Sequence, residues 1–326
     1  MTIRFLTIAA AAAVLVAVTV HAQSPLLLVL NKEDAQLAFV DVGSGKVIAR
    51  VPTGEAPHEL AVSADGKLAF ASNYGAQTPG SSISVIDVAS HKELRRVDVS
   101  PLRRPHGLWF ADGKLYFTAE ANRVVARYDP ATGKVDWIMG TGLVGTHTVV
   151  ANQDASRLFA ANIGSDAIAV LERGANPLAW NETVIAVGKG PEALDLSPDG
   201  RELWTAHSRD GGVSIIDVAS KKVALTIDLR TRRSNRLKFT PDGKLVLVSD
   251  LDAGELVVVD AASRKEVKRI PVGRMAEGIL IPPDGARAYV AVAGDGAVAI
   301  VDLKTLSVSG KIETGRGPDG MGWVGR

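Results

Sequence analysis

Apolar and polar residues alternate along this chain in short runs that recur about every 43 residues. Residues 192–228 show one complete unit, with apolar or alternating runs at 192–196, 202–206, 213–217 and 222–228. Runs of this length, rich in β-branched residues and separated by Gly-containing turns, are typical of short antiparallel strands. Asp199 and Gly200 join the first two runs, and an Asp-Gly pair suits a hairpin turn with positive φ. The pattern therefore predicts four short strands in each unit.

The third run of each unit ends in a marker, an apolar residue followed by an acidic one. The acidic residues of this marker are Asp41, Asp87, Asp129, Glu172, Asp217, Asp260 and Asp302. Seven units of four strands predict an all-β, seven-bladed β-propeller, because a four-stranded blade cannot bury both faces alone and must stack on its neighbours. The regularity of the acidic residue indicates a structural role in the turn that follows it.

The two ends of the chain carry complementary parts of one unit. Residues 26–30 match the second strand of the other units, and residues 317–324 match the missing innermost strand. We therefore expect the C-terminal strand to join blade one and close the ring of antiparallel blades.

The repeat also resembles a known family. The segments 63–67 (Ser-Ala-Asp-Gly-Lys), 70–73 (Phe-Ala-Ser-Asn) and 84–87 (Ser-Val-Ile-Asp) are similar to the successive parts of a YVTN β-propeller repeat. The resemblance to this superfamily of lactonase-like seven-bladed propellers covers nearly the whole chain. It implies the fold but no single function, because relatives include exported binding proteins, surface proteins, DNA-binding proteins and lactonase-type enzymes. No motif matches the lactonase catalytic residues position for position, so none is carried over.

The N-terminus has the pattern of a secretory signal peptide. Arg4 precedes an apolar run from Phe5 to Val20, and a small-residue cleavage pattern ends at Ala22. A membrane anchor is the alternative, but the run is short for a spanning helix and no basic segment follows it. We therefore expect residues 1–22 to be removed. Residues 23–326 then form a single propeller domain, monomeric, without a membrane span, and periplasmic or secreted.

Charge and cysteine content exclude several classes of function. The chain has 37 Lys and Arg, 36 Asp and Glu, and no Cys. Removal of Arg4 with the signal peptide leaves 36 basic and 36 acidic residues, so the mature protein is formally neutral. Neutrality argues against a protein whose main partner is nucleic acid or an anionic membrane. The absence of Cys excludes disulfides, thiolate metal sites and Cys nucleophiles.

Alignment of the units places polar residues in two rings at one mouth of the central channel, here called the top mouth. The first ring, at the start of strand one, consists of His58, His106, His147, Glu192, Asn235, Glu277 and Asp319. The second ring, at the end of strand two, consists of Asn31, Asn73, Glu120, Asn162, His207, Asp250 and Val292. Four of the five mature histidines fall in these rings, which is the strongest sign of a site in the sequence.

Three histidines from consecutive blades suggest a metal site. Neutral imidazole is a usual ligand of Zn, Cu, Fe and Ni, so His58, His106 and His147 could hold one divalent ion. Glu192 or Glu277 could then be a fourth ligand or a general base, and Glu120 could orient a ligating histidine. The alternative is that these residues only line a hydrated channel and cap the strand starts.

Basic residues in the loops before strand one form a second candidate surface. They are Arg103, Arg104, Lys189, Arg232, Arg233, Arg236, Arg274 and Arg316. Together with Tyr74 they could hold a carboxylate, a phosphate or single-stranded nucleic acid. The best pairs for this role are Arg232 with Arg233 and Arg103 with Arg104. The alternative is a solvated rim balanced by Glu55, Glu59 and Glu277.

The leading functional hypothesis is a scaffold that binds a small molecule or a protein at the top mouth, with or without a metal ion. The candidate ligand-binding residues are Asn73, Tyr74, Glu120, Asn162, His207, Arg232, Arg233, Asn235, Asp250 and Asp319. The alternative is a metal-dependent hydrolase or lyase in which Glu192 or Glu277 moves the proton. DNA binding through the arginine loops is a third hypothesis, against which the neutral charge counts.

Overall fold

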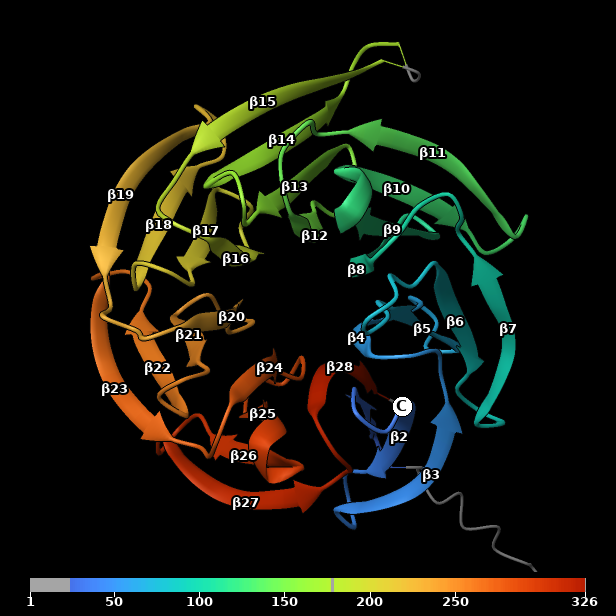
Figure 1. The fold of residues 1–326 in the computed structure, drawn as a ribbon. Helices are drawn as coiled ribbons and strands as arrows, with labels where there is room; N and C mark the ends of the chain where they lie inside the picture. Colours follow the sequence, from blue (N-terminus) through green and yellow to red (C-terminus); the bar gives the residue numbers. More distant parts are fainter. Residues whose placement is uncertain (1–23, 177–178, 326) are drawn as a thin grey trace, which may run out of the picture.

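The computed structural model describes residues 24–176 and 179–325, and the predicted signal peptide lies outside this part of the chain. Over the described residues, 28 strands form seven four-stranded antiparallel sheets. The sheets stand around a central axis as the blades of a propeller (Figure 1). The predicted all-β, seven-bladed fold is therefore confirmed.

The strands of each blade follow the chain from the channel outward, except in blade one. Blade one consists of β28 (Pro318–Val324), β1 (Leu26–Asn31), β2 (Gln36–Asp41) and β3 (Lys46–Pro52). Blade two consists of β4 (Pro57–Val62), β5 (Leu68–Asn73), β6 (Ser82–Asp87) and β7 (Lys92–Asp98). Blade three consists of β8 (Pro105–Ala111), β9 (Lys114–Ala119), β10 (Val124–Asp129) and β11 (Lys134–Gly140). Blade four consists of β12 (Thr146–Ala151), β13 (Arg157–Asn162), β14 (Ala167–Arg173) and β15 (Trp180–Ala186).

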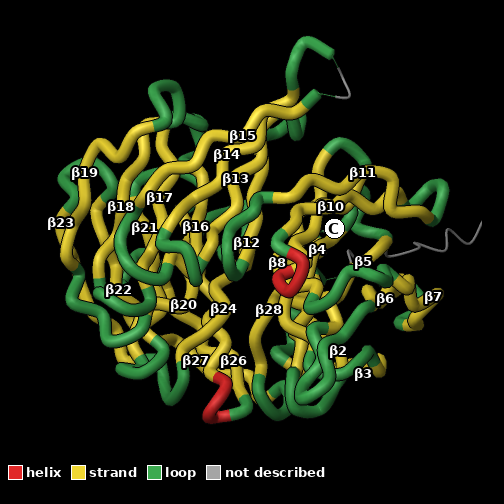
Figure 2. The backbone as a smooth tube through the Cα atoms, turned by 45° about the horizontal axis from the view of Figure 1, so that its top comes forward, coloured by secondary structure: helices red, strands yellow, loops and turns green. Residues whose placement is uncertain are grey.

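The remaining blades repeat this order. Blade five consists of β16 (Pro191–Leu196), β17 (Glu202–His207), β18 (Gly212–Asp217) and β19 (Lys222–Asp228). Blade six consists of β20 (Ser234–Phe239), β21 (Leu245–Asp250), β22 (Glu255–Asp260) and β23 (Lys265–Pro271). Blade seven consists of β24 (Ala276–Leu280), β25 (Arg287–Val292), β26 (Ala297–Asp302) and β27 (Ser307–Glu313). Two single-turn 3₁₀ helices, Glu120–Asn122 and Ala293–Asp295, follow β9 and β25 and are the red segments of Figure 2.

The predicted ring closure is confirmed. Strand β28 pairs antiparallel with β1, with Val324 opposite Leu26 and Trp323 opposite Leu27. The first and last strands therefore share one sheet, as the neighbouring blue and red ribbons in Figure 1 show. This pairing leaves no free inner edge on β1, which is how closed β-structures avoid edge-to-edge association.

The hydrophobic core lies between the blades. One cluster joins Trp204 and Ile215 of blade five to Phe239 and Val248 of blade six, and comparable clusters lie between the other blades. Each sheet therefore buries its faces against its neighbours, as the repeat pattern predicts.

The acidic marker has the expected structural role. The Asp41 carboxylate, for example, accepts hydrogen bonds from the Ser44 backbone N–H at 2.7 Å and the Ser44 hydroxyl at 2.6 Å. An acidic side chain of this kind fixes the turn that follows its strand. Among the described residues, no helix is long and apolar enough to cross a membrane.

Candidate functional site

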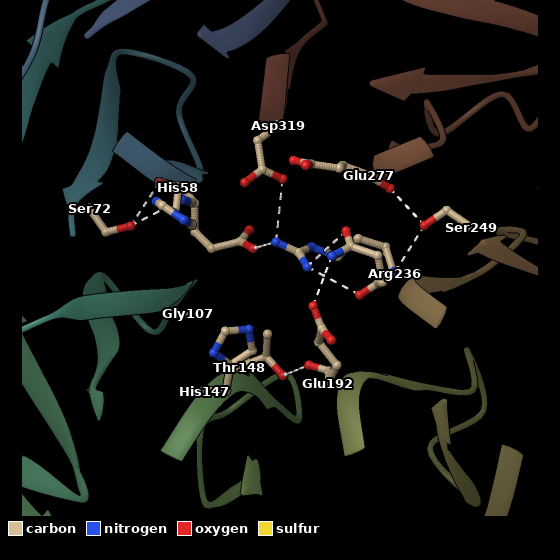
Figure 3. Close-up of polar contacts among 12 residues, drawn as sticks. His58, Ser72, Gly107, His147, Thr148, Glu192, Arg236, Ser249, Glu277 and Asp319 are labelled. Carbon is tan, nitrogen blue, oxygen red and sulfur yellow. Dashed lines mark hydrogen bonds and ion pairs between the residues drawn. The ribbon is translucent and has the colours of Figure 1, made fainter. Parts of the chain in front are cut away.

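A β-bulge near the start of each inner strand places the first ring. In β4, for example, pairing with β5 shifts register between Pro57 and Leu60, so that His58 and Glu59 lie opposite no regular partner. Comparable shifts occur at the starts of β16, β20 and β24. Because a bulge re-aims the side chains of its extra residues, it can turn residues of the first ring toward the channel. Figure 3 shows five of these residues, His58, His147, Glu192, Glu277 and Asp319, around one space.

A buried ion network occupies the middle of this space. Arg236 of β20 contacts the Glu59 carboxylate and lies 3.5 Å from Asp319 Oδ1. Asn235 donates from Nδ2 to Glu192 Oε1 at 2.8 Å. Figure 3 shows Arg236 between Asp319 and Glu192. Side chains from blades one, two, five and six are thus connected across the axis.

Lys32 links the carboxylates of Glu277 and Asp319 on the other side of the network. Its Nζ atom lies 2.5 Å from Glu277 Oε2 and 3.3 Å from Asp319 Oδ2. Burial raises the pKa of Glu277 to about 7, and the nearby charge of Asp319 adds to this effect. Burial also acts to raise the pKa of Asp319, but Lys32 and Arg236 overcome it and hold that pKa at about 2. The two carboxyl groups therefore have different protonation behaviour, as is common at functional sites.

The three first-ring histidines form a cluster with Tyr74. The rings of His106 and His147 stack with centroids 3.8 Å apart, and His58 packs 5.1 Å from His106 and 4.6 Å from Tyr74. Tyr74 donates its hydroxyl to Glu120 at 2.8 Å. Burial lowers the pKa of His58 to about 4 and the pKa of His106 well below its usual value. These two imidazoles are therefore neutral at physiological pH.

Two imidazole nitrogens in this cluster lack a hydrogen-bond partner. They are Nδ1 of His106 and Nδ1 of His147, both buried, with no partner within the part of the chain that the structure describes. The Glu120 carboxylate lies 3.5 Å from His147 Nδ1, too far for a good hydrogen bond. Since buried polar atoms are nearly always satisfied by protein or by ordered water, each of these nitrogens can form a hydrogen bond with a water molecule or a ligand.

The structure does not arrange the histidines around a common point. Among the described residues, no three His, Asp or Glu side chains are placed to hold a metal ion. The stacking of His106 on His147 keeps their rings nearly parallel, at 28°. The metal site of His58, His106 and His147 thus stays a prediction, one that requires the rings to turn.

The second ring braces the loops that enter strand one. Asn73 Oδ1 accepts a hydrogen bond from the Gly54 N–H at 2.9 Å, and Asp250 accepts from the N–H groups of Arg232 and Arg233 at 2.7 and 3.0 Å. Asn162 accepts from the Thr146 hydroxyl at 2.8 Å. These side chains are buried and already engaged within their own blades.

His207 departs from the second-ring pattern. It is buried and bonds Asp210 through Nδ1 at 2.9 Å, and Asp210 in turn accepts from the Lys189 N–H at 2.6 Å. Asp210 therefore takes the loop-bracing role that Asn or Asp has in other blades. A ligand-binding role for Asn73, Asn162, His207 and Asp250 stays a prediction.

The rim arginines lie apart from the inner network. Arg232 and Arg233 are exposed, and only their backbone N–H groups bond to Asp250. Arg104 packs over the Tyr74 ring at 4.5 Å, which connects the rim to the histidine cluster on one side. The anion-binding and DNA-binding roles of these side chains stay predictions.

The sequence does not place three members of the inner network in the channel, namely Arg236, Glu59 and Lys32. The alternative of a solvated rim is wrong for Arg236, Glu59 and Glu277, because the channel buries Arg236 and Glu277 and half-buries Glu59. No sequence pattern singles out Lys32, which follows β1. The positions of Glu59 and Arg236 in the repeat could have indicated a role in the channel. Both are the third residues of their inner strands, and three other inner strands have glycine at this position, namely Gly107 in β8, Gly278 in β24 and Gly320 in β28.

Comparison with known proteins identifies one matching family model. The model of the cytochrome D1 heme domain matches residues 104–285, more than half of the chain. Dihydro-heme d1 dehydrogenase of Pseudomonas aeruginosa is 36% identical over 95 residues, 29% of this chain and 18% of that protein. The uncharacterized protein YncE of Salmonella typhimurium is 24% identical over 177 residues, 53% of this chain and 49% of that protein. The chain thus spans less than half the length of these curated relatives.

Solved structures share the fold at low sequence identity. The periplasmic gluconolactonase PpgL of Pseudomonas aeruginosa superposes with a TM-score of 0.74 and 21% identity, covering 92% of this chain and 99% of that one. Hydrazine synthase of Kuenenia stuttgartiensis superposes with a TM-score of 0.70 and 20% identity, covering 81% of this chain and 88% of that one. At this level of identity the likeness shows the fold alone.

Proposed function

The chain belongs to the cytochrome D1 heme domain family, and we propose that it is a ligand-binding propeller whose site is the top mouth of the central channel. The observation that carries the proposal is the pair of buried, unpartnered imidazole nitrogens of His106 and His147 beside the ion network. A buried polar cluster with missing partners and a strongly shifted carboxyl pKa is typical of a site that a ligand completes.

The family name implies a heme, but the residues at the mouth do not fit one. A heme needs an axial ligand such as His or Tyr, with open space beside that ligand for the flat macrocycle. Here His106 is covered by His147 and His58, and His58 also packs on Tyr74. The Arg236 side chain lies across the middle of the ring of inner strands. The proposed function therefore uses no heme.

The charges of the mouth indicate the chemistry of the ligand. Four acidic groups face one another here, namely Glu59, Glu192, Glu277 and Asp319, and two cations, Lys32 and Arg236, lie among them. The excess of carboxylate favours a ligand that brings hydrogen-bond donors or positive charge. The neutral imidazoles beside these carboxylates can accept hydrogen bonds from the same ligand. An amino- or hydroxyl-bearing small molecule and a divalent cation both meet these requirements.

Binding of D-glucosamine and of Zn²⁺ tests the proposal on protein purified without a His tag or chelator. We expect at least one of these probes to raise the melting temperature of the wild type and of His91→Ala, which alters a histidine outside both rings. The same probe should have no effect on His106→Ala or His147→Ala, because these variants lack the unpartnered nitrogens. Equal shifts in all variants, or no binding of either probe, would contradict the proposal. Elemental mass spectrometry of the purified protein reports whether a metal is already present.

A lactone hydrolase is the second candidate function. PpgL, which shares the fold, is a gluconolactonase, and Glu277 has the raised pKa of about 7 that suits a general base. In this reaction the Glu277 carboxylate takes a proton from a water molecule while the oxygen of that water attacks the lactone carbonyl. The ring C–O bond then breaks, and the leaving oxygen takes up a proton.

Hydrolysis of D-glucono-δ-lactone in a pH-stat tests this second candidate. We expect a rate above the spontaneous one that increases as the pH passes about 7, where Glu277 ionises. Glu277→Gln should lower the rate by roughly a hundredfold, since general bases contribute about 10²–10⁴. Glu313→Gln, which alters an exposed carboxylate of β27, is the control. A rate that Glu277→Gln leaves unchanged would exclude Glu277 as the base.

Export of the protein belongs to the same proposal. The predicted cleavage after Ala22 and the periplasmic location of PpgL both favour it. The N-terminal residue of the protein recovered from its native host tests it: Gln23 supports export, and Met1 contradicts it.

A further inference from the structure

A cavity lies within the central channel, beyond the ion network. Its volume is about 370 Å³, within the range of small-molecule sites. Inner strands of five blades (β4, β8, β20, β24 and β28) contribute its walls. The apolar residues that matter most are Val62, Phe110, Ile279, Ile281 and Met321. We call this space the lower channel cavity.

The lower channel cavity faces away from the histidine cluster. Along β4 the chain runs from His58 at the top mouth, through Glu59, to Val62, and the lining begins at Glu59. The contact between Glu59 and Arg236 therefore forms the boundary with the top mouth. At the other end, Trp109 and Phe110 also line a groove of about 1060 Å³ among the turns that join strands one and two. A ligand can thus enter from the face opposite the proposed site.

The walls expose apolar surface at the centre of the molecule. Val62, Phe110, Ile281 and Met321 are only half-buried, although they come from four different blades and converge on one space. Apolar side chains that line an open cavity are costly in water and are a common mark of a ligand site. Trp109 belongs to this wall: it is half-buried, lines the cavity and also packs against two of the hydrophobic clusters between blades.

One cationic side chain of the wall is incompletely paired. Lys238 follows Arg236 on β20, and within the described residues the only carboxylate paired with its Nζ atom is Asp195, at 3.4 Å. The Asp195 carboxylate also accepts the Phe239 N–H at 2.9 Å. Nζ lies 5.7 Å from the centre of the Trp109 ring, against the apolar wall. An ammonium has three donors, so this group can donate a further hydrogen bond to an anionic partner.

We propose that the lower channel cavity binds a small amphipathic carboxylate, with its alkyl or aryl body against the apolar walls and its carboxylate on Lys238. The volume and the half-exposed apolar side chains account for the body of the ligand. Lys238 accounts for the charge, because Glu59 and Arg236 at the boundary already pair with each other. The site is independent of the imidazoles and of the function proposed for the top mouth.

Calorimetric titration of the purified protein with octanoate, 1-octanol and acetate tests this inference. Octanoate should bind, 1-octanol should bind more weakly, and acetate should not bind. Val62→Phe fills the cavity and should abolish octanoate binding, whereas Val308→Phe, on the outer strand β27, should not. Lys238→Met should weaken octanoate about tenfold and leave 1-octanol unchanged, as expected for loss of one charged hydrogen bond. Lys268→Met, an exposed change on β23, is its control.

Each result has a defined meaning for the proposal. Octanoate binding that is lost with Val62→Phe and weakened by Lys238→Met supports it. Absence of octanoate binding overturns it, and so does binding that neither variant changes. Equal affinities for octanoate and 1-octanol would overturn the assignment of the carboxylate to Lys238. If His106→Ala still binds octanoate, this site is separate from the top mouth. If His106→Ala no longer binds octanoate, the two sites are not independent.

Discussion

At the scale of single residues, Glu277 and Asp319 show how position within a network decides chemistry. Both carboxylates contact Lys32, but Asp319 also lies 3.5 Å from Arg236. Lys32 and Arg236 together keep Asp319 ionised, whereas burial together with the charge of Asp319 favours the protonated form of Glu277. When two coupled acids are pushed apart in this way, the one with the higher pKa can exchange a proton near neutral pH.

The pH dependence of stability tests the pKa of Glu277. Its pKa is about 7 in the folded protein and 4.5 for a glutamate free in water, so between these values the folded protein retains a proton that the unfolded chain releases. The stabilisation is complete below about pH 4.5 and is lost as the pH rises through 7. Relative to Glu277→Gln, which cannot ionise, the wild type should lose up to about 3 kcal/mol across this window.

Urea unfolding at several pH values measures this difference. Glu313→Gln, at an exposed position on β27, should follow the wild type throughout. Parallel curves for the wild type and Glu277→Gln between pH 4.5 and 7 would show that Glu277 has an ordinary pKa.

At the scale of elements, the β-bulge at the start of each inner strand has two structural effects. It can turn one side chain into the channel, and it brings the next residue against the neighbouring blade. A Cβ added at Gly278 would collide with the carbonyl oxygen of Asp319, and one added at Gly107 would lie 2.7 Å from the Thr148 Cα. Glycine at these positions therefore lets β24 and β8 approach the next inner strand.

Alanine substitution tests the close approach of these strands. Gly278→Ala should destabilise the protein by about 1–3 kcal/mol, because the colliding atom belongs to the backbone and cannot move alone. Gly310→Ala on β27 is the matched control, since its added Cβ would meet only Ile300 Cδ1 at 3.6 Å. Chemical denaturation measures both. Equal stabilities of the two variants would show that the inner strands have room to separate.

At the scale of the whole molecule, closure of the ring holds both channel sites together. Strand β28 supplies Asp319 to the top mouth and Met321 to the lower channel cavity. Among the described strands its one partner is β1, at the other end of the chain, and it packs between β4 and β24. The sites therefore exist only after the last strand has joined the first blade.

Removal of residues 318–326 tests this dependence. We expect the shortened chain to lose its cooperative thermal transition and to self-associate, because the edge of β1 becomes available for pairing. Calorimetry and size-exclusion chromatography with light scattering measure the two effects. Removal of residues 325–326 alone, which spares β28, should change neither. A cooperative transition near the wild-type temperature would show that six complete blades are sufficient.

The sequence by itself determined the fold, because strand alternation, turn residues and the acidic marker are local patterns repeated in every unit. It also determined that His58, His106, His147, Glu277 and Asp319 belong to one ring, since equivalent positions in a closed ring must face the same axis. It therefore predicted which side chains would meet at the top mouth.

Only the tertiary structure decided what these residues contact. Whether His106 faces a metal or stacks on His147, and whether Arg236 lies at the rim or in the channel, depends on rotamers and distances between blades. The sequence does not encode these distances locally, because they result from how closely neighbouring blades pack. The same holds for the lower channel cavity, whose walls come from five blades and have no signature in any one repeat.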